Sequence, residues 1–463
     1  MPDVEGITHE AASLYRFIES IQRFCASQPG FAAYLEGSRD FLLFIDGLAN
    51  STKTYLEARP DNVPDNAVEY RVYRQELSML RFAWHYVHRL VKPVADAHTL
   101  YLPESLIDCV VQRLRSLPDF KASKLAILHI RELNYLQVIA SDMQRKLTQI
   151  ANLVDFSSTF LTDLGLIGIP YSQANSVLMN SLIAHEIGHF VFEKRQLKYA
   201  LGPKILVALD ASFKAVHDKV EDGRRIQDVF ASWSEELFCD LFAVRFIGPC
   251  YCYAFVEAFD LSRHLETDGT IHSRFAAPQL LFSYSHPADF YRIQRQAEML
   301  RRLGWWAHIA NSKSATWGFL ERCEALPPSC FSFPFPPALQ SSFIQALDLL
   351  VGDITAAVEE SVRGLDTGVA GYTQLSQQVK ECFLEGIVPS TVRDPDTGKP
   401  VDVVTVLNVA YLLYLDNLPE LIGRIEGQNA GSVKDRTRWT EKLEHWTLKA
   451  LGDLALISSK VGG

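Results

Sequence analysis

The chain has few cysteines, eight in 463 residues, and no two of them form a Cys-x-x-Cys pair. This scarcity argues against a disulfide-stapled scaffold and against a zinc site built from paired thiolates. A chain of this length can bury enough apolar surface to fold without either support. We therefore expect reduced thiols and a cytoplasmic location.

The chain also lacks an excess of basic residues and a long apolar run. Its 45 Lys and Arg residues against 55 Asp and Glu residues give a formal charge of −10, so we expect no nucleic-acid partner. The N-terminal segment has no basic region followed by an apolar one, which predicts no signal peptide. The longest apolar stretch, residues 403–415, is interrupted by Thr405 and Asn408 and is shorter than the roughly 20 residues of a spanning helix. We therefore expect no membrane span.

The hydrophobic pattern predicts a mainly α-helical protein with a small β-sheet, organised in three regions. Residues 1–115 are expected to be an N-terminal helical region, residues 116–310 a catalytic domain, and residues 311–463 a C-terminal helical region. A break at residues 117–119 supports the first boundary, and a proline-rich stretch at residues 327–337 lies near the second.

Two apolar segments of the middle region predict strands. Residues 125–130 form a short apolar run. Residues 164–170 are apolar, contain two glycines and end in proline, which suits an edge strand that could pair with an extended substrate. A long helix is expected to follow, from about Ser172 to Glu193.

The most informative segment is His185-Glu186-Ile187-Gly188-His189, an HExxH pattern. Positions i and i+4 lie on one face of a helix, so both histidines can point a ring nitrogen at one zinc ion. Glu186 follows the first histidine, and its carboxylate can reach an attacking water without binding the metal, as a general base must. The alternative for the pattern alone is a helix that carries two surface or core histidines.

A second pair of residues supplies what such a zinc site lacks. A catalytic zinc takes three protein ligands and keeps one position open for water. Glu236 and Asp240 are again i and i+4, on a predicted helix that is otherwise largely apolar, where carboxylates are almost never buried unless paired or bound to metal. Glu236 is the predicted third ligand. Asp240 can accept a hydrogen bond from the far nitrogen of a ligating histidine.

Two neighbours of this pair compete for roles at the metal. Glu235 is the other candidate for the third ligand, but the residue four positions on is Cys239, so the i, i+4 pairing favours Glu236. Cys239 could itself approach the metal, although a free cysteine also suits a small apolar position.

HExxH followed by ExxxD resembles the gluzincin metallopeptidases. The long interval from His189 to Glu236 resembles the family of HtpX and the CAAX prenyl proteases, which carries a third motif of His-Pro followed by Arg-Ile. Here that motif begins at His286 and includes Arg292. The resemblance covers roughly residues 160 to 300, and it implies a zincin-like catalytic core without the membrane spans found in well-known members.

The resemblance also implies roles for single residues. The zinc ligands would be His185, His189 and Glu236, with Glu186 as general base and Asp240 supporting a histidine. Arg292 would lie near the cleft, where its fork of donors could hold a developing oxyanion or a substrate carboxylate. His286 would either donate to the tetrahedral intermediate or occupy the open zinc position as a latch. Without such a role, His286 and its proline mark the start of a helix.

These features predict a zinc metalloendopeptidase that hydrolyses a protein or peptide substrate with Zn²⁺ as cofactor. The flanking helical regions could shield the cleft and make the enzyme latent, which leaves room for a regulatory partner. One alternative is a zinc hydrolase with a non-peptide substrate, and another is an interaction or regulatory protein with little or no turnover. Glu186 argues against a purely structural zinc site, because such a site needs no base and is usually rich in thiolates.

Overall fold

The computed structural model describes most of the chain, in stretches separated by short gaps. The described residues are 4–27, 36–58, 67–97, 104–130, 136–137, 140–157, 163–170, 176–212, 226–261, 280–311, 315–333, 339–426 and 433–461.

These residues form a mainly α-helical protein with a small β-sheet, as the sequence predicts. The chain divides into two compact units, one of residues 1–104 and 118–175, the other of residues 105–117 and 176–463. These boundaries differ from the three regions expected above. The strands group with the N-terminal helices, and the HExxH segment groups with the C-terminal part of the chain.

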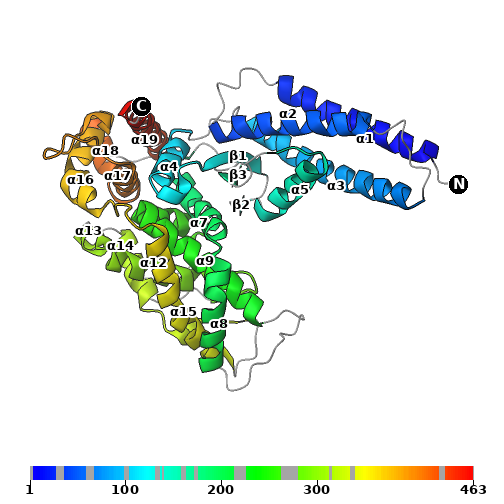
Figure 1. Ribbon diagram of the computed structural model, residues 1–463. Coiled ribbons are helices and arrows are strands. Elements are labelled where there is room, and N and C mark those ends of the chain that lie inside the picture. The colour runs from blue at the N-terminus through cyan, green and yellow to red at the C-terminus, as the bar shows by residue number, and fades with distance from the viewer. Residues whose placement is uncertain are drawn as a thin grey trace. The chain divides into compact units, whose positions relative to one another are not determined.

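Unit 1 packs long helices against a three-stranded sheet (Figure 1). Its elements are α1 (Val4–Ser27), α2 (Glu36–Glu57), α3 (Ala67–Ala97), a 3-10 turn η2 (Pro118–Phe120), β1 (Lys124–Ile130), β2 (Leu136–Gln137), α5 (Ala140–Leu153) and β3 (Leu164–Pro170). Apolar residues at helical spacing, such as Ile18, Leu48 and Trp84, face inward and form the core of the unit. The predicted break at residues 117–119 is confirmed, because the preceding helix ends at Arg115 and the short turn η2 begins at Pro118.

Strand β3 is central in the sheet and not at its edge. The strand order is β1-β3-β2, with β3 parallel to β1 and antiparallel to β2. All residues of β3 are buried, and Ile167 and Gly168 pair with a strand on each side. Both segments predicted as strands are confirmed, but the edge position is wrong. Because β3 already has a neighbour on each side, the expectation that it pairs with a substrate loses its support.

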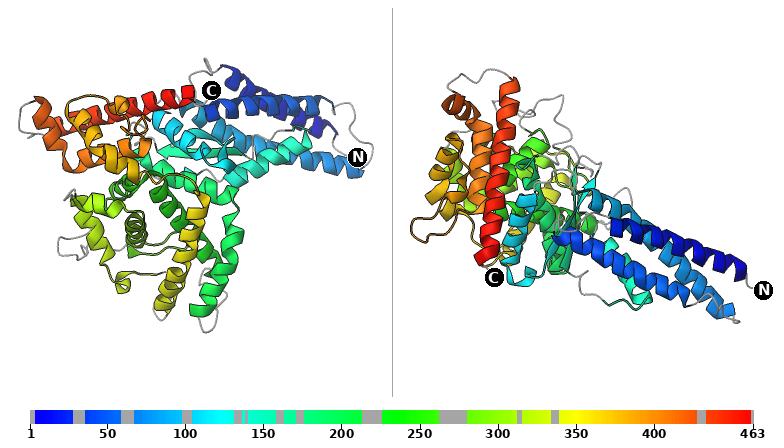
Figure 2. Two further views of the ribbon diagram at one scale, coloured as in Figure 1. Left: turned by 60° about the vertical axis from the view of Figure 1, so that its left-hand side comes forward. Right: turned by 90° about the horizontal axis from the view of Figure 1, so that it is seen from above.

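In unit 2, several helices pack against α9, and the last four helices of the chain pack with one another. Its elements are α4 (Glu104–Arg115), η4 (Met179–Leu182), α7 (Ile183–Lys194), α8 (Leu197–Ser212), α9 (Ile226–Ile247), α10 (Pro249–Ala258), α12 (Asp289–Arg302), α13 (Trp305–Asn311), α14 (Ala315–Glu324), η6 (Pro328–Cys330), α15 (Gln340–Ser361), α16 (Val369–Leu384), η8 (Pro389–Thr391), α17 (Val403–Asp416), α18 (Leu418–Glu426) and α19 (Val433–Val461). The red helix α19 lies beside α17 (Figure 2). Of the predicted proline-rich break, residues 334–337 lie outside the described part of the chain.

The helix that carries HExxH begins later than predicted. Residues 172–175 of the expected helix lie outside the described residues, and α7 starts only at Ile183, after the 3-10 turn η4. Ser176 accounts for the delay. Its hydroxyl accepts a hydrogen bond from the backbone N–H of Met179, and its carbonyl accepts one from the side chain of Asn180. Such local side-chain bonds compete with regular helix.

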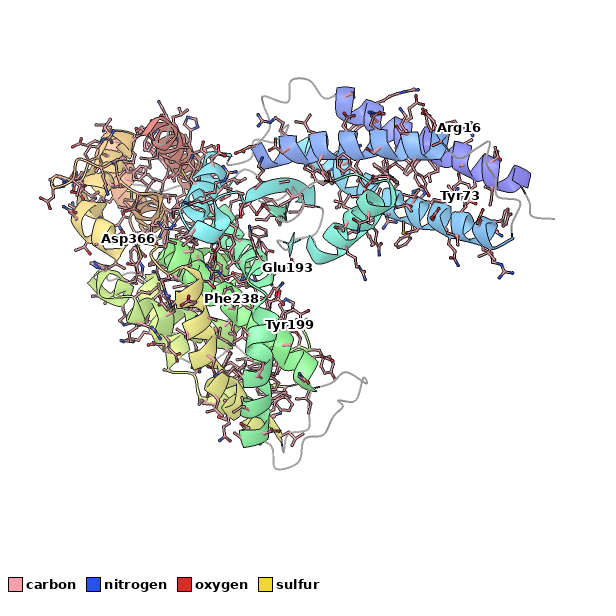
Figure 3. All side chains as sticks on the ribbon, viewed as in Figure 1. Arg16, Tyr73, Glu193, Tyr199, Phe238 and Asp366 are labelled. Carbon is pink, nitrogen blue, oxygen red and sulfur yellow. The ribbon has the colours of Figure 1, made fainter. Side chains whose placement is uncertain are left out.

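Helices α7 and α9 cross at very close range. A Cβ atom added to Gly188 would lie 2.8 Å from the Cα atom and 3.0 Å from the Cβ atom of Cys239, so only glycine fits there. Phe238, beside this crossing, is fully buried among the side chains drawn in Figure 3. The crossing places the HExxH motif directly against the ExxxD motif.

In the part of the chain that the structure describes, α15 is the one helix long and apolar enough to cross a membrane. Its apolar residues Phe343, Leu347, Leu350 and Ile354 are buried, and the helix packs against α8 and α9. The core helix of a globular unit meets the same criteria of length and composition.

Candidate metal centre

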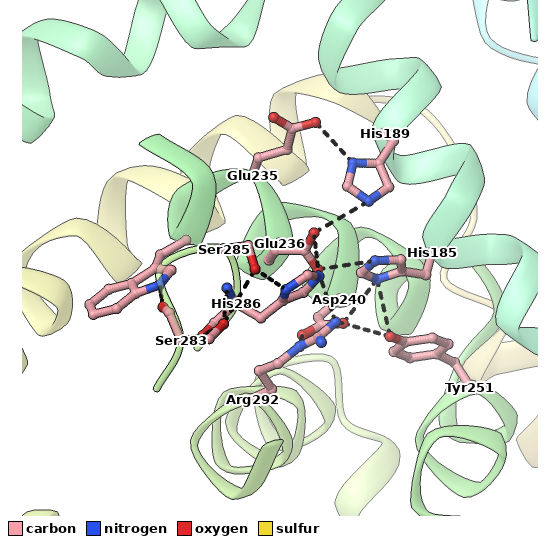
Figure 4. A network of polar contacts seen from close by, with 11 residues as sticks. His185, His189, Glu235, Glu236, Asp240, Tyr251, Ser283, Ser285, His286 and Arg292 are labelled. Carbon is pink, nitrogen blue, oxygen red and sulfur yellow. Dashed lines mark hydrogen bonds and ion pairs between the residues drawn. The ribbon is translucent and has the colours of Figure 1, made fainter. Parts of the chain in front are cut away.

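The two histidines of HExxH lie on one face of α7, as their spacing predicts (Figure 4). Their ring centroids are 5.0 Å apart. The Nε2 atoms of both rings face the carboxylate of Glu236 on α9. The distances are 3.4 Å from His185 to Oε2 and 3.7 Å from His189 to Oε1. Donors bound to one tetrahedral zinc lie roughly 3.3–3.6 Å apart, so this convergence fits a shared metal ion.

A second set of possible donors shares the two histidines but has Cys239 in place of Glu236. Ligand atoms of His185, His189 and Cys239 lie within 4.8 Å of one another, and this group could hold a metal ion. Burial raises the pKa of the Cys239 thiol well above its ordinary value, which favours the neutral thiol when no metal is bound. Burial also acts to raise the pKa of Glu236, but the hydrogen bond with His185 and the charge of Arg292 lower it to about 2. Glu236 is therefore the donor that is already anionic.

Asp240 lies one turn beyond Glu236 and holds the far side of His185. It is fully buried, and its Oδ1 atom lies 3.0 Å from Nδ1 of His185. The same carboxylate accepts a hydrogen bond of 2.6 Å from the hydroxyl of Tyr251 and two from Arg292. Burial acts to lower the pKa of His185, but its hydrogen bonds with Asp240 and Glu236 raise it to about 10.

Arg292 is buried, with 4 % of its surface exposed, and its guanidinium is engaged by carboxylates. Its Nε and one terminal nitrogen donate to Asp240 at 2.7 and 2.8 Å, and the guanidinium lies 3.3 Å from Glu236. A planar fork is well suited to such a paired contact. Arg292 therefore ties together the two carboxylates of ExxxD.

Glu186 is buried on α7, with 6 % of its surface exposed. Among the described residues, its carboxylate makes no hydrogen bond or ion pair. Its charge acts on both His189 and Cys239, which places it beside the converging donors. An unengaged carboxylate at this place remains free to accept a proton.

His286 stands at the rim, in a loop that is fixed by hydrogen bonds. Its Nε2 atom lies 3.4 Å from Oε1 of Glu236, and about half of its side chain is exposed. The loop is closed by bonds between Ser283 and His286, and the indole of Trp233 on α9 donates to the carbonyl of Ser283 at 2.7 Å. The backbone is thereby held, while the imidazole reaches toward the centre from the solvent side. A helix does follow this loop, but α12 begins at Asp289, so Pro287 precedes the helix and is not in its first turn.

All the site residues expected from the sequence thus lie together, and two contacts were not foreseen. Tyr251, on α10, bonds to Asp240 and lies 3.2 Å from Nδ1 of His185. No spacing pattern marks it, because it lies on a different helix. Glu235, weighed above as a ligand, contacts Nδ1 of His189 at 2.9 Å. In the sequence, only its position beside Glu236 pointed to a role for Glu235 at this centre.

No protein-family model, curated protein or solved structure matches this chain.

Proposed function

We propose that this protein is a zinc metallopeptidase with a zincin-like core, as its resemblance to the gluzincins implies. One observation carries the proposal: the Nε2 atoms of His185 and His189 converge on the carboxylate of Glu236, and each histidine is backed by a carboxylate at Nδ1. Two imidazoles and one carboxylate form the donor set of many catalytic zinc sites, which leave a position open.

His185, His189 and Glu236 would hold the zinc. Bound zinc lowers the pKa of water and polarises a carbonyl group. Cys239 is not needed as a ligand, because two imidazoles and one carboxylate already supply three donors and the Cα and Cβ atoms of Cys239 lie in the close crossing with Gly188.

Glu186 is the proposed general base. One of its carboxylate oxygens takes a proton from the attacking water as the water oxygen bonds to the peptide carbonyl carbon. The same oxygen then passes the proton to the leaving amine nitrogen as the C–N bond breaks. Its lack of any hydrogen bond or ion pair with the described residues supports this role.

Arg292 and His286 play different parts in this proposal. The contacts of Arg292 with Asp240 and Glu236 favour a role in fixing the ligands over direct contact with substrate. His286 lies on the solvent side of Glu236, where it is in reach of a substrate or of the metal. Either the transition-state donor or the latch fits that position.

The test is cleavage of an unstructured protein such as casein by the full chain, purified without chelator and assayed for zinc. We expect about one zinc per chain, and cleavage that a chelator abolishes and added zinc restores. Fully zinc-loaded protein that cleaves nothing, both as the parent chain and as His286→Ala, would contradict the peptidase assignment.

A further inference from the structure

The two histidines of the centre are supported by carboxylates in very different surroundings. Asp240, behind His185, is fully buried and shared with Arg292 and Tyr251. Glu235, behind His189, has 36 % of its side chain exposed. Both carboxylates come from α9 and lie on either side of Glu236 in sequence, so one helix supplies the third ligand and both supports.

The contact of Glu235 excludes it as a ligand in this arrangement. Its Oε1 atom lies 2.9 Å from Nδ1 of His189. The other nitrogen of the ring, Nε2, is the one that faces Glu236. Because the two nitrogens lie on different sides of the imidazole, a carboxylate bonded to Nδ1 is held away from the point where the donors converge.

We propose that Glu235 is the positioning residue of His189, an inference that rests on the proposed metal site. By accepting a hydrogen bond from Nδ1, it fixes the proton on that nitrogen and leaves Nε2 as the donor toward the metal. It also sets the angle of the ring. His189 is therefore oriented by a carboxylate that is partly exposed to solvent, whereas His185 is oriented by a carboxylate in the core.

Because Glu235 is less buried than Asp240, its effect on metal binding can be measured apart from its effect on the stability of the fold. The contact between Glu235 and His189 is partly buried and involves a single carboxylate oxygen, so loss of Glu235 should cost the metal-free fold little. Loss of a carboxylate that orients a ligating histidine lowers metal affinity about 10- to 100-fold. Glu235 should thus affect the metal without affecting unfolding.

The experiment uses three variants of the full chain. Glu235→Ala removes the acceptor, and Glu235→Gln keeps an amide oxygen that can accept from Nδ1. Glu193→Gln is the matched control. Glu193 lies one turn beyond His189 on α7, and its raised pKa, caused first by burial and then by the charge of Glu235, shows that the two carboxylates are neighbours.

Zinc affinity is measured by competition with a chelator, and the thermal unfolding midpoint is measured for each metal-free protein. We expect Glu235→Ala to weaken zinc binding about 10- to 100-fold with an unchanged midpoint, and the other two variants to stay within a few-fold of the parent. The cobalt-loaded protein gives a spectroscopic check, because the visible bands of Co²⁺ report ligand geometry. Those bands should change in Glu235→Ala and be preserved in Glu235→Gln.

Three results would overturn the inference. The first is that Glu235→Ala binds zinc as tightly as the parent does, the second is that Glu193→Gln weakens binding equally, and the third is that Glu235→Gln loses as much affinity as Glu235→Ala. The last result would point to Glu235 as a metal ligand, and the second to a general effect of charge. Failure of the proposed function appears differently, as a parent protein that binds zinc but cleaves no peptide, or binds no zinc at all.

Discussion

The Nδ1 atom of His185 lies 3.0 Å from Oδ1 of Asp240, although 55 positions separate the two residues in sequence. The carboxylate is fully buried, and the charge of Arg292 and the hydrogen bond of His185 hold its pKa well below the usual range against the effect of burial. Asp240 is therefore ionised and accepts the hydrogen bond of Nδ1–H of His185, so a metal would bind at the other ring nitrogen. The Nε2 atom is left to face Glu236.

Substitution of Asp240→Asn should weaken metal binding and destabilise the protein together. We expect about 10- to 100-fold lower zinc affinity, because the neutral amide no longer pairs with Arg292 and the buried network that orients His185 is lost. The loss also leaves the buried Arg292 without its main anionic partner, which typically costs about 3–5 kcal/mol of unfolding free energy. Chelator competition and denaturant unfolding measure the two effects. If neither changes, Asp240 is only a packing residue.

Substitutions can decide whether the third ligand, beside His185 and His189, is Glu236 or Cys239. His185→Ala, His189→Ala and Glu236→Ala should each lose tightly bound zinc, whereas Cys239→Ser should retain it. A thiolate bound to Co²⁺ gives an intense charge-transfer absorption band in the near ultraviolet. We expect the cobalt-loaded parent protein to lack that band. If the band is present and Cys239→Ser loses zinc, the third ligand is Cys239 and not Glu236.

Glu186→Gln should retain the zinc and the fold but lose hydrolysis. The carboxylate of Glu186 is proposed to move a proton and not to bind the metal. Replacing it with the neutral amide of glutamine should therefore remove only the proton transfer. A loss of about 10²- to 10⁴-fold in the rate of peptide cleavage is expected. Zinc analysis and an assay on a casein-like substrate provide the comparison. Equal cleavage by variant and parent would rule out this mechanism.

Gly188→Ala should open the crossing of α7 and α9. The added Cβ would meet the Cα atom of Cys239 at 2.8 Å, which is backbone and cannot turn aside. Overpacking of this kind costs about 1–3 kcal/mol, and it should also weaken zinc binding because the two motifs move apart. Gly202→Ala on α8 is the control, since nothing lies within 4 Å of its added Cβ. Equal unfolding midpoints in the two variants would mean that the crossing adapts freely.

His286→Ala separates the two roles of His286. If the imidazole covers the open metal position as a latch, the variant should cleave unstructured substrates faster than a weakly active parent. If the imidazole stabilises the transition state, the variant should be slower on every substrate. Ser285→Ala is a control for the orientation of the ring, because the Ser285 hydroxyl lies 2.8 Å from Nδ1 of His286. Strong cleavage by the unmodified protein would end the latency hypothesis.

The local features of the centre could be predicted from the sequence. The spacing of His185 and His189 and of Glu236 and Asp240 follows from the helical repeat, which depends only on neighbouring residues. The mainly helical class and the segments of β1 and β3 were likewise predicted from hydrophobic patterns. In each case the periodicity within one element is enough.

Only the tertiary structure decided the contacts between elements. It placed β3 between two strands, delayed the start of α7 and put Glu235 behind His189, because each depends on which segments pack together. It also turned Arg292 toward Asp240 and brought Tyr251 from α10. A buried polar group must find its partner wherever packing places one, and that partner has no fixed distance along the chain.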